Sequence, residues 1–340
     1  MPIRGFFKRQ TPLSRAAAGL LTISAACTGA GNGATLPLHV VADVPLPGDT
    51  SRFDYESYDA QRHLLFIAHL GASEVLAFDT QAQRVVAQVT GVRHVHGVLA
   101  IPELGRVYAS ATGTDEVVAI DEARMAVVAR MPGGTYPDGM AYAPEAHKLY
   151  VSDEHGETET VIDVRSNQRV ATIPLGGTVG NSQYDPVSKH IFVNVQSRRQ
   201  LFEIDPATDQ VIARNDLAGA DGNHGLLIEP QRRLAFIACE DNDKLLVFDL
   251  ESRKVVSSFD VGKDPDVLAY DAGLGLLYIA GESGIGSLFK LDATGLTKVA
   301  DGLVGPSAHV VAVDPDSHRA YFPIKNLDGK PMLRITEPPR

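Results

Sequence analysis

Seven residues able to carry a charge or bind a metal recur in this sequence at nearly equal spacing. Successive members are 42 or 43 residues apart. Three are histidines, although the whole chain of 340 residues contains only 11. The seven are Asp54, His96, Asp138, Asn181, His224, Asp266 and His309. Such a recurrence predicts a repeated structural unit in which one position points its side chain toward a shared centre.

Imidazole nitrogens and carboxylate oxygens are the ligands that divalent metals take from proteins. His96, His224 and His309 could bind a metal directly and leave a coordination position open. The aspartates and Asn181 could complete the ligand set or orient the imidazoles. Two other interpretations remain: a hydrated polar lining without a metal, or protonated histidines that bind an anion or take part in catalysis. Mixed ligands suit Zn, Fe, Mn, Cu or Ni, whereas aspartates alone would suit Ca.

The elements that would position this ring are short strands. An aromatic residue within a strand-like segment recurs seven times, 42 to 44 residues apart, and marks seven units. These residues are Phe66, Tyr108, Tyr150, Phe192, Phe236, Tyr278 and Tyr321. Each unit has the pattern of four short strands, which is typical of a propeller blade. We therefore expect an all-β fold, a seven-bladed β-propeller with the ring residues on the innermost strands.

The seventh unit supplies only about three strands, so the ring needs one more. A strand-like segment, Leu38 to Val44, precedes the first unit. Pairing it into the last blade would close the ring and cover the exposed strand edges.

Two of the repeats carry a family resemblance. Leu149-Tyr150-Val151-Ser152, followed by Thr160-Val161-Ile162-Asp163, and also Leu277-Tyr278-Ile279-Ala280, resemble the YVTN repeat of YncE-like β-propellers. The similarity covers about residues 45 to 340. It implies a secreted bacterial propeller and assigns no reaction, because one fold supports many functions.

The mouth of the channel should be acidic. Residues just past each aromatic lie at the end of the second strand, on the same face as the ring. Glu154, Glu240 and Glu282 fall there, and we expect His69 beside them. They would form an electronegative funnel for cations, unless they are only exposed hairpin residues.

The N-terminal residues have the features of an export signal. Four basic residues precede an eight-residue apolar run, Ala16 to Ile23, which is too short to span a bilayer. We expect a signal peptide at 1–26, a flexible linker at 27–36 and one propeller domain at 37–340. The protein would then be periplasmic or at the cell surface, either free or lipid-anchored at Cys27.

Charge and missing motifs narrow the function. The net charge of −11 becomes more negative by four when residues 1–26 are removed. The rest of the chain has no concentrated basic patch. Both observations argue against nucleic-acid binding. Common nucleophile, phosphate-loop and zinc motifs are missing. We therefore expect a binding module for a divalent metal or a small cationic ligand. The alternatives are a metal-dependent hydrolase or lyase, and a scaffold for a protein partner.

Overall fold

The computed structural model describes residues 36–338, which form one compact unit. The predicted signal peptide, Cys27 and nearly all of the predicted linker lie outside the described residues. Within the described part, no helix is both long and apolar enough to cross a membrane.

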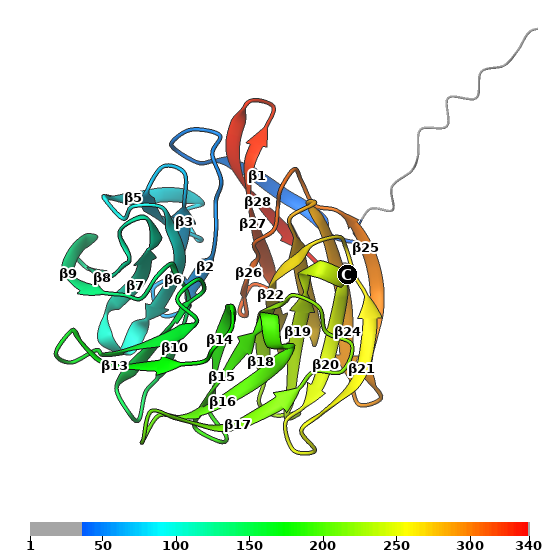
Figure 1. Cartoon of the computed structure of the whole chain (residues 1–340). Helices are drawn as coiled ribbons and strands as arrows, with labels where there is room; N and C mark the ends of the chain where they lie inside the picture. The colour runs from blue at the N-terminus through cyan, green and yellow to red at the C-terminus, as the bar shows by residue number, and fades with distance from the viewer. Residues whose placement is uncertain (1–35, 339–340) are drawn as a thin grey trace, which may run out of the picture. The chain divides into compact units, whose positions relative to one another are not determined.

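Seven four-stranded antiparallel sheets make up this unit, and they follow one another around a central axis (Figure 1). The prediction of a seven-bladed β-propeller is confirmed. In each of the first six blades the strands pair in chain order from the innermost outward. Blade 1 contains β2 (Glu56–Asp59), β3 (Leu64–His69), β4 (Glu74–Asp79) and β5 (Arg84–Thr90). Blade 2 contains β6 (Val95–Ile101), β7 (Arg106–Ala111), β8 (Glu116–Asp121) and β9 (Ala126–Pro132).

The next four blades repeat this plan. Blade 3 contains β10 (Pro137–Ala143), β11 (Lys148–Asp153), β12 (Thr158–Asp163) and β13 (Gln168–Pro174). Blade 4 contains β14 (Val179–Asp185), β15 (His190–Val195), β16 (Gln200–Asp205) and β17 (Gln210–Asp216). Blade 5 contains β18 (Asn223–Glu229), β19 (Leu234–Cys239), β20 (Lys244–Asp249) and β21 (Lys254–Asp260). Blade 6 contains β22 (Pro265–Asp271), β23 (Leu276–Gly281), β24 (Ile285–Asp292) and β25 (Gly295–Leu303). Single turns of 3-10 helix lie at η1 (Pro102–Leu104), η2 (Thr112–Thr114), η3 (Gln196–Arg198) and η4 (Glu240–Asn242).

Blade 7 is completed from the other end of the unit, as predicted. It contains β26 (Ala312–Asp314), β27 (Arg319–Leu327) and β28 (Lys330–Glu337), and β1 (His39–Pro45) pairs with β28 as its outermost strand (Figure 1). The guanidinium of Arg334 donates to both carboxylate oxygens of Asp43 across this pair, at 2.8 and 2.7 Å. The ring is therefore closed by hydrogen bonds between strands almost 300 residues apart.

The seven recurring aromatics form the contacts between blades. All are 4% exposed or less, and each lies on the second strand of its blade. Tyr108 of blade 2, for example, packs in one cluster with Met140 and Leu149 of blade 3. Fully burying such a side chain stabilises a fold by roughly 1.5–3 kcal/mol. The same packing fixes each inner strand relative to its neighbours, and so positions the central channel.

Candidate functional site

Five of the seven ring residues lie where the inner strands bulge. In blades 2 to 6 the pairing of the first two strands shifts around the ring position, for example between Asn223 and Leu226, which flank His224. A bulge leaves a residue out of the ladder and redirects its side chain. The ring residues can therefore face the channel while the rest of each strand stays paired.

Glycine after the ring residue allows the blades to approach closely. A Cβ at Gly225 would lie 2.0 Å from the carbonyl oxygen of Asp266 in the next blade, and one at Gly97 would lie 2.2 Å from that of Asp138. Neither distance is compatible with a side chain at these positions. This packing brings ring residues of adjacent blades within reach of one another.

A cavity of about 830 Å³ lies over the ring. Five of the seven predicted ring residues are in its wall: Asp54, His96, Asp138, His224 and Asp266. Asn181 instead lines a second cavity of about 140 Å³, and His309 is in the wall of neither. The seven ring residues therefore occupy equivalent positions in the sequence repeats, but they do not all line the same cavity.

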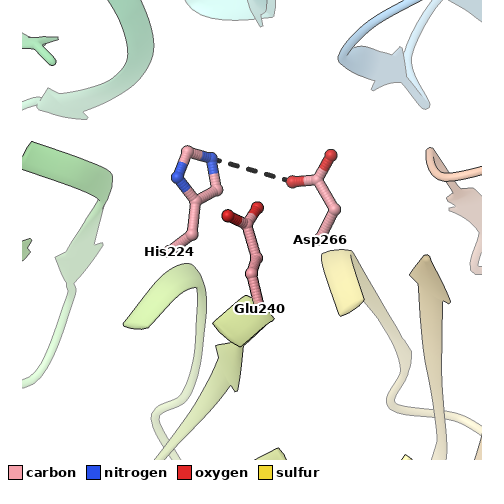
Figure 2. A group of neighbouring side chains, drawn as sticks. All are labelled: His224, Glu240 and Asp266. Carbon is pink, nitrogen blue, oxygen red and sulfur yellow. Dashed lines mark ion pairs between the residues drawn. The ribbon is translucent and has the colours of Figure 1, made fainter. Parts of the chain in front are cut away.

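Three side chains on one side of the large cavity converge. His224 and Asp266 come from β18 and β22, and Glu240 opens η4 directly after β19. Their ligand atoms all lie within 4.8 Å of one another. His224 Nε2 is 3.7 Å from Asp266 Oδ1, and Figure 2 shows the Glu240 carboxylate beside both. Asp266 is 4% exposed, and its Oδ1 has no hydrogen-bond partner.

A second group repeats this arrangement one blade further along. Asp266, Glu282 and His309 also place ligand atoms within 4.8 Å of one another. His309 Nδ1 is 3.0 Å from the Ser307 carbonyl oxygen, which can only accept, so Nδ1 carries the proton. His309 is 2% exposed and its Nε2 has no partner. That nitrogen consequently keeps a buried, unused lone pair.

The first group holds an imidazolium among carboxylates. Burial alone would lower the pKa of His224, but Glu240, Asp266 and Asp138 together raise it to about 9. Burial raises the pKa of Glu240 to about 7, although the charge of His224 acts against this, and Asp266 and Glu154 add to the rise. Burial likewise raises the pKa of Asp266. Near neutral pH the imidazole of His224 is therefore protonated, and its positive charge lies among these carboxylates.

Tyr55 crosses the channel, and the sequence prediction missed it. Its hydroxyl donates to Asn181 Oδ1 at 2.7 Å and lies 3.0 Å from His224 Nε2. Because that hydroxyl hydrogen is used on Asn181, His224 Nε2 must donate to the tyrosine oxygen. Tyr55 lines both cavities and so separates them.

A sequence signal for Tyr55 exists. The position after each ring residue is otherwise small or β-branched, and Tyr55 is its one aromatic: Tyr55, Gly97, Gly139, Ser182, Gly225, Val267 and Val310.

His96 is held differently from His224. Its Nδ1 donates to the His94 carbonyl oxygen and to Thr112 Oγ1, at 3.0 and 2.9 Å. Its Nε2 then accepts from the Tyr136 hydroxyl at 3.1 Å. Burial lowers the pKa of His96, so it is neutral. The structure therefore does not gather the three predicted imidazoles around one point, and His96 has no lone pair free.

Asp54 is engaged by a cation of the same loop. Arg52 Nε donates to Asp54 Oδ2 at 3.2 Å, and its terminal nitrogen also donates to Glu282 Oε1. Burial lowers the pKa of Arg52, but Asp54, Glu282 and Asp266 outweigh this and raise it. Asp138 is freer: the Tyr55 hydroxyl is 3.5 Å from its Oδ2, and its Oδ1 has no partner.

Three of the four residues predicted at the mouth lie in the cavity wall. Glu154, Glu240 and Glu282 are in the wall of the large cavity. His69 is not: its side chain is fully buried and stacks on Phe53 with ring centres 4.2 Å apart. We correct its placement, because His69 precedes the mouth position by one residue and side chains alternate along a strand.

The wall of the large cavity is rich in acidic side chains. It carries nine carboxylate side chains against two permanently charged basic side chains, Arg52 and Lys263. The carboxylates are those of Asp54, Asp138, Glu154, Glu240, Asp241, Asp243, Asp264, Asp266 and Glu282. Charges of one sign lining a cleft raise the local concentration of oppositely charged ligands.

Comparison with known proteins identifies the fold and no family. No protein-family model matches this chain, and no curated protein matches it. Among solved structures it is similar to a chain of hydrazine synthase from Kuenenia stuttgartiensis, with a TM-score of 0.69 and 17% identity over 83% of this chain and 94% of that one. It is also similar to a chain of the mitotic checkpoint complex, with a TM-score of 0.72 and 12% identity over 95% and 98%. At these identities the likeness concerns the propeller fold alone.

Proposed function

We propose that this propeller is a binding module that holds a divalent transition metal in its central cavity, with His224, Glu240 and Asp266 as ligands. The observation that carries the proposal is their convergence from two adjacent blades around the buried, unpartnered Oδ1 of Asp266. A buried carboxylate oxygen without a partner is costly, and a cation at this point would remove that cost.

The donor types indicate the class of metal. One imidazole with carboxylates suits borderline metals such as Zn²⁺ or Mn²⁺ better than Ca²⁺, which takes six to eight oxygens. Three protein ligands also leave positions for water or for a bound ligand.

A supporting partner for the imidazole is in place. The side-chain amide of Gln196 lies 2.8 Å from His224 Nδ1. The amide nitrogen also donates to the Val179 carbonyl oxygen, at 3.3 Å, so the amide is anchored on the backbone, holds the imidazole in place and leaves Nε2 for the metal. Metal binding would then release the proton that Nε2 donates to Tyr55.

The proposal also covers the family of the propeller and its location in the cell. The YVTN-like repeats favour a YncE-like propeller, and the N-terminal pattern favours a periplasmic or surface location, either free or lipid-anchored. The approach of metal ions to such a cavity would be assisted by its carboxylates.

The test is metal content and affinity. Protein stripped with a chelator would be equilibrated with Zn²⁺ or Mn²⁺ and analysed for bound metal. We expect retained metal, and at least about a 100-fold loss of affinity in His224→Gln, since even residues that only support a ligand cost 10–100-fold. His96→Gln is the matched control from the same ring and should bind as the parent does. A parent protein that retains no metal would overturn the proposal.

A further inference from the structure

The two ligand groups are successive copies of one arrangement. Each consists of the ring residue of a blade, the acidic residue after that blade's second strand, and the ring residue of the next blade. Blades 5 and 6 give His224, Glu240 and Asp266, and blades 6 and 7 give Asp266, Glu282 and His309. Asp266 ends the first group and begins the second. The rotational repeat of the propeller therefore generates two neighbouring ligand sets that share one carboxylate.

We propose that blades 5 to 7 bind two divalent cations side by side, bridged by the Asp266 carboxylate, with Glu282 and His309 as the ligands of the second. This rests on the proposed function and specifies its site. Each cation receives one imidazole and one glutamate of its own, in the order His224, Glu240, Asp266, Glu282, His309. Metal pairs in proteins are typically about 3.5–4 Å apart, a separation that a bridging carboxylate spans.

The second group carries its own evidence for a ligand. His309 is buried and its Nε2 has no hydrogen-bond partner, and an unsatisfied polar atom in such a position calls for an explanation. His309 Nδ1 is 3.7 Å from Glu282 Oε2, so the imidazole lies directly beside that carboxylate. A metal with Nε2 as ligand would satisfy the lone pair.

No other blade pair can repeat this set. At the mouth position blades 1, 2 and 4 carry Leu70, Thr112 and Gln196, and blade 7 carries Lys325. Blade 3 has Glu154, but the next ring residue is Asn181, whose side-chain oxygen already accepts from Tyr55. Two cations, rather than a ring of them, are therefore expected.

Arg52 makes the second position the weaker one. Its guanidinium donates to Glu282 Oε1 and to Asp54 Oδ2, so it serves as the cation of this group when no metal is bound. A metal that binds Glu282 must displace or share that contact. We therefore expect sequential filling, with the site at His224 first.

The experiment is a titration of chelator-stripped full-length protein with Mn²⁺, followed by elemental analysis and electron paramagnetic resonance. We expect two equivalents, with an exchange-coupled signal appearing as the second binds. Glu282→Gln should retain one equivalent and lose the coupled signal. Glu240→Gln should weaken the first site, and Asp266→Asn should weaken both.

Arg52→Gln supplies a gain-of-binding test that unfolding cannot imitate. It removes the competing charge yet keeps a hydrogen-bond donor for Asp54, so the second equivalent should bind about tenfold more tightly. Exactly one equivalent in the parent, unchanged in Glu282→Gln, would overturn the two-cation site and leave the proposed function standing. Two uncoupled equivalents that ignore Glu282→Gln would also overturn it. No bound metal would overturn the proposed function itself.

Discussion

Two arcs of the central ring, blades 1 to 4 and blades 5 to 7, use the same strand position but satisfy their polar atoms differently. In the first arc Asp54 is held by Arg52, His96 by Tyr136, and Asn181 by Tyr55. In the second arc Asp266 Oδ1 and His309 Nε2 have no partner. Both arcs contain histidine and aspartate. The arcs differ in whether a neighbouring side chain already forms a hydrogen bond with the oxygen or nitrogen of the ring residue. Asp138 is intermediate, because one of its two carboxylate oxygens has no partner.

The largest effect should come from filling the glycine contacts of each arc. Gly225→Ala places a Cβ 2.0 Å from the Asp266 carbonyl oxygen, and Gly97→Ala places one 2.2 Å from that of Asp138. We expect each to cost about 1–3 kcal/mol and to lower the melting temperature by about 2–6 °C. Calorimetry and metal analysis on both should show that only Gly225→Ala loses metal. Equal metal loss in the two variants would erase the distinction between the arcs.

The two arcs should also respond to pH with opposite sign. The pKa of His224 is raised to about 9, so its contribution to stability is complete below its ordinary pKa of 6.5 and is lost as pH rises through 9. The pKa of His96 is lowered, so its contribution is present above 6.5 and is lost as pH falls.

Melting temperatures of the metal-free protein between pH 5 and 9.5 would measure this. His224→Gln should remove a fall of about 2–4 °C on the alkaline side, whereas His96→Gln should leave that fall in place. Glu240, with a pKa of about 7, contributes a fall of the same sign at lower pH, between its ordinary value of 4.5 and 7. An alkaline fall that persists in His224→Gln would contradict the assigned imidazolium.

The smallest expected effect belongs to the side chain that joins the arcs. Tyr55→Phe removes the hydroxyl shared by Asn181 and His224, which leaves a buried amide oxygen without its donor. We expect a loss of about 1 kcal/mol, or about 2 °C, because a net hydrogen bond contributes this much. Thermal unfolding checks it, and Tyr58→Phe is the control, because this half-buried tyrosine lies outside both cavities and its hydroxyl makes only a longer contact, 3.4 Å to His63 Nδ1. A loss of stability no greater than that of the control would mean that the hydrogen bonds of the Tyr55 hydroxyl do not stabilise the fold.

The fold follows from the sequence because a propeller repeats its core. One aromatic per unit gives the number of blades, and a missing strand at one end with a spare strand at the other gives the closure. The ring register follows by the same alignment. Burial and pairing within a blade are local, so a repeat of about 42 residues is enough to locate them.

The alignment does not predict which ring residues have hydrogen-bond partners and which do not. This depends on side chains from other positions, such as Arg52 reaching Glu282 from a segment 230 residues away. The prediction for His69 is wrong because side chains alternate along β3, so His69 and the mouth position next to it point to opposite faces of the sheet. At the equivalent position the other blades carry buried residues, including Ala111, Asp153 and Cys239, which is the signal that would have placed it between sheets.

The closure of blade 7 also determines when the cavity can first exist. β1 precedes every other described strand in the sequence, whereas its partner β28 spans Lys330–Glu337. Until those residues emerge, the blade that presents His309 lacks its outer strands and the contact with blade 1. A nascent chain therefore carries Glu240 and Glu282 but cannot yet present the complete site. Binding that requires His309 therefore has to wait until the two ends of the propeller have paired.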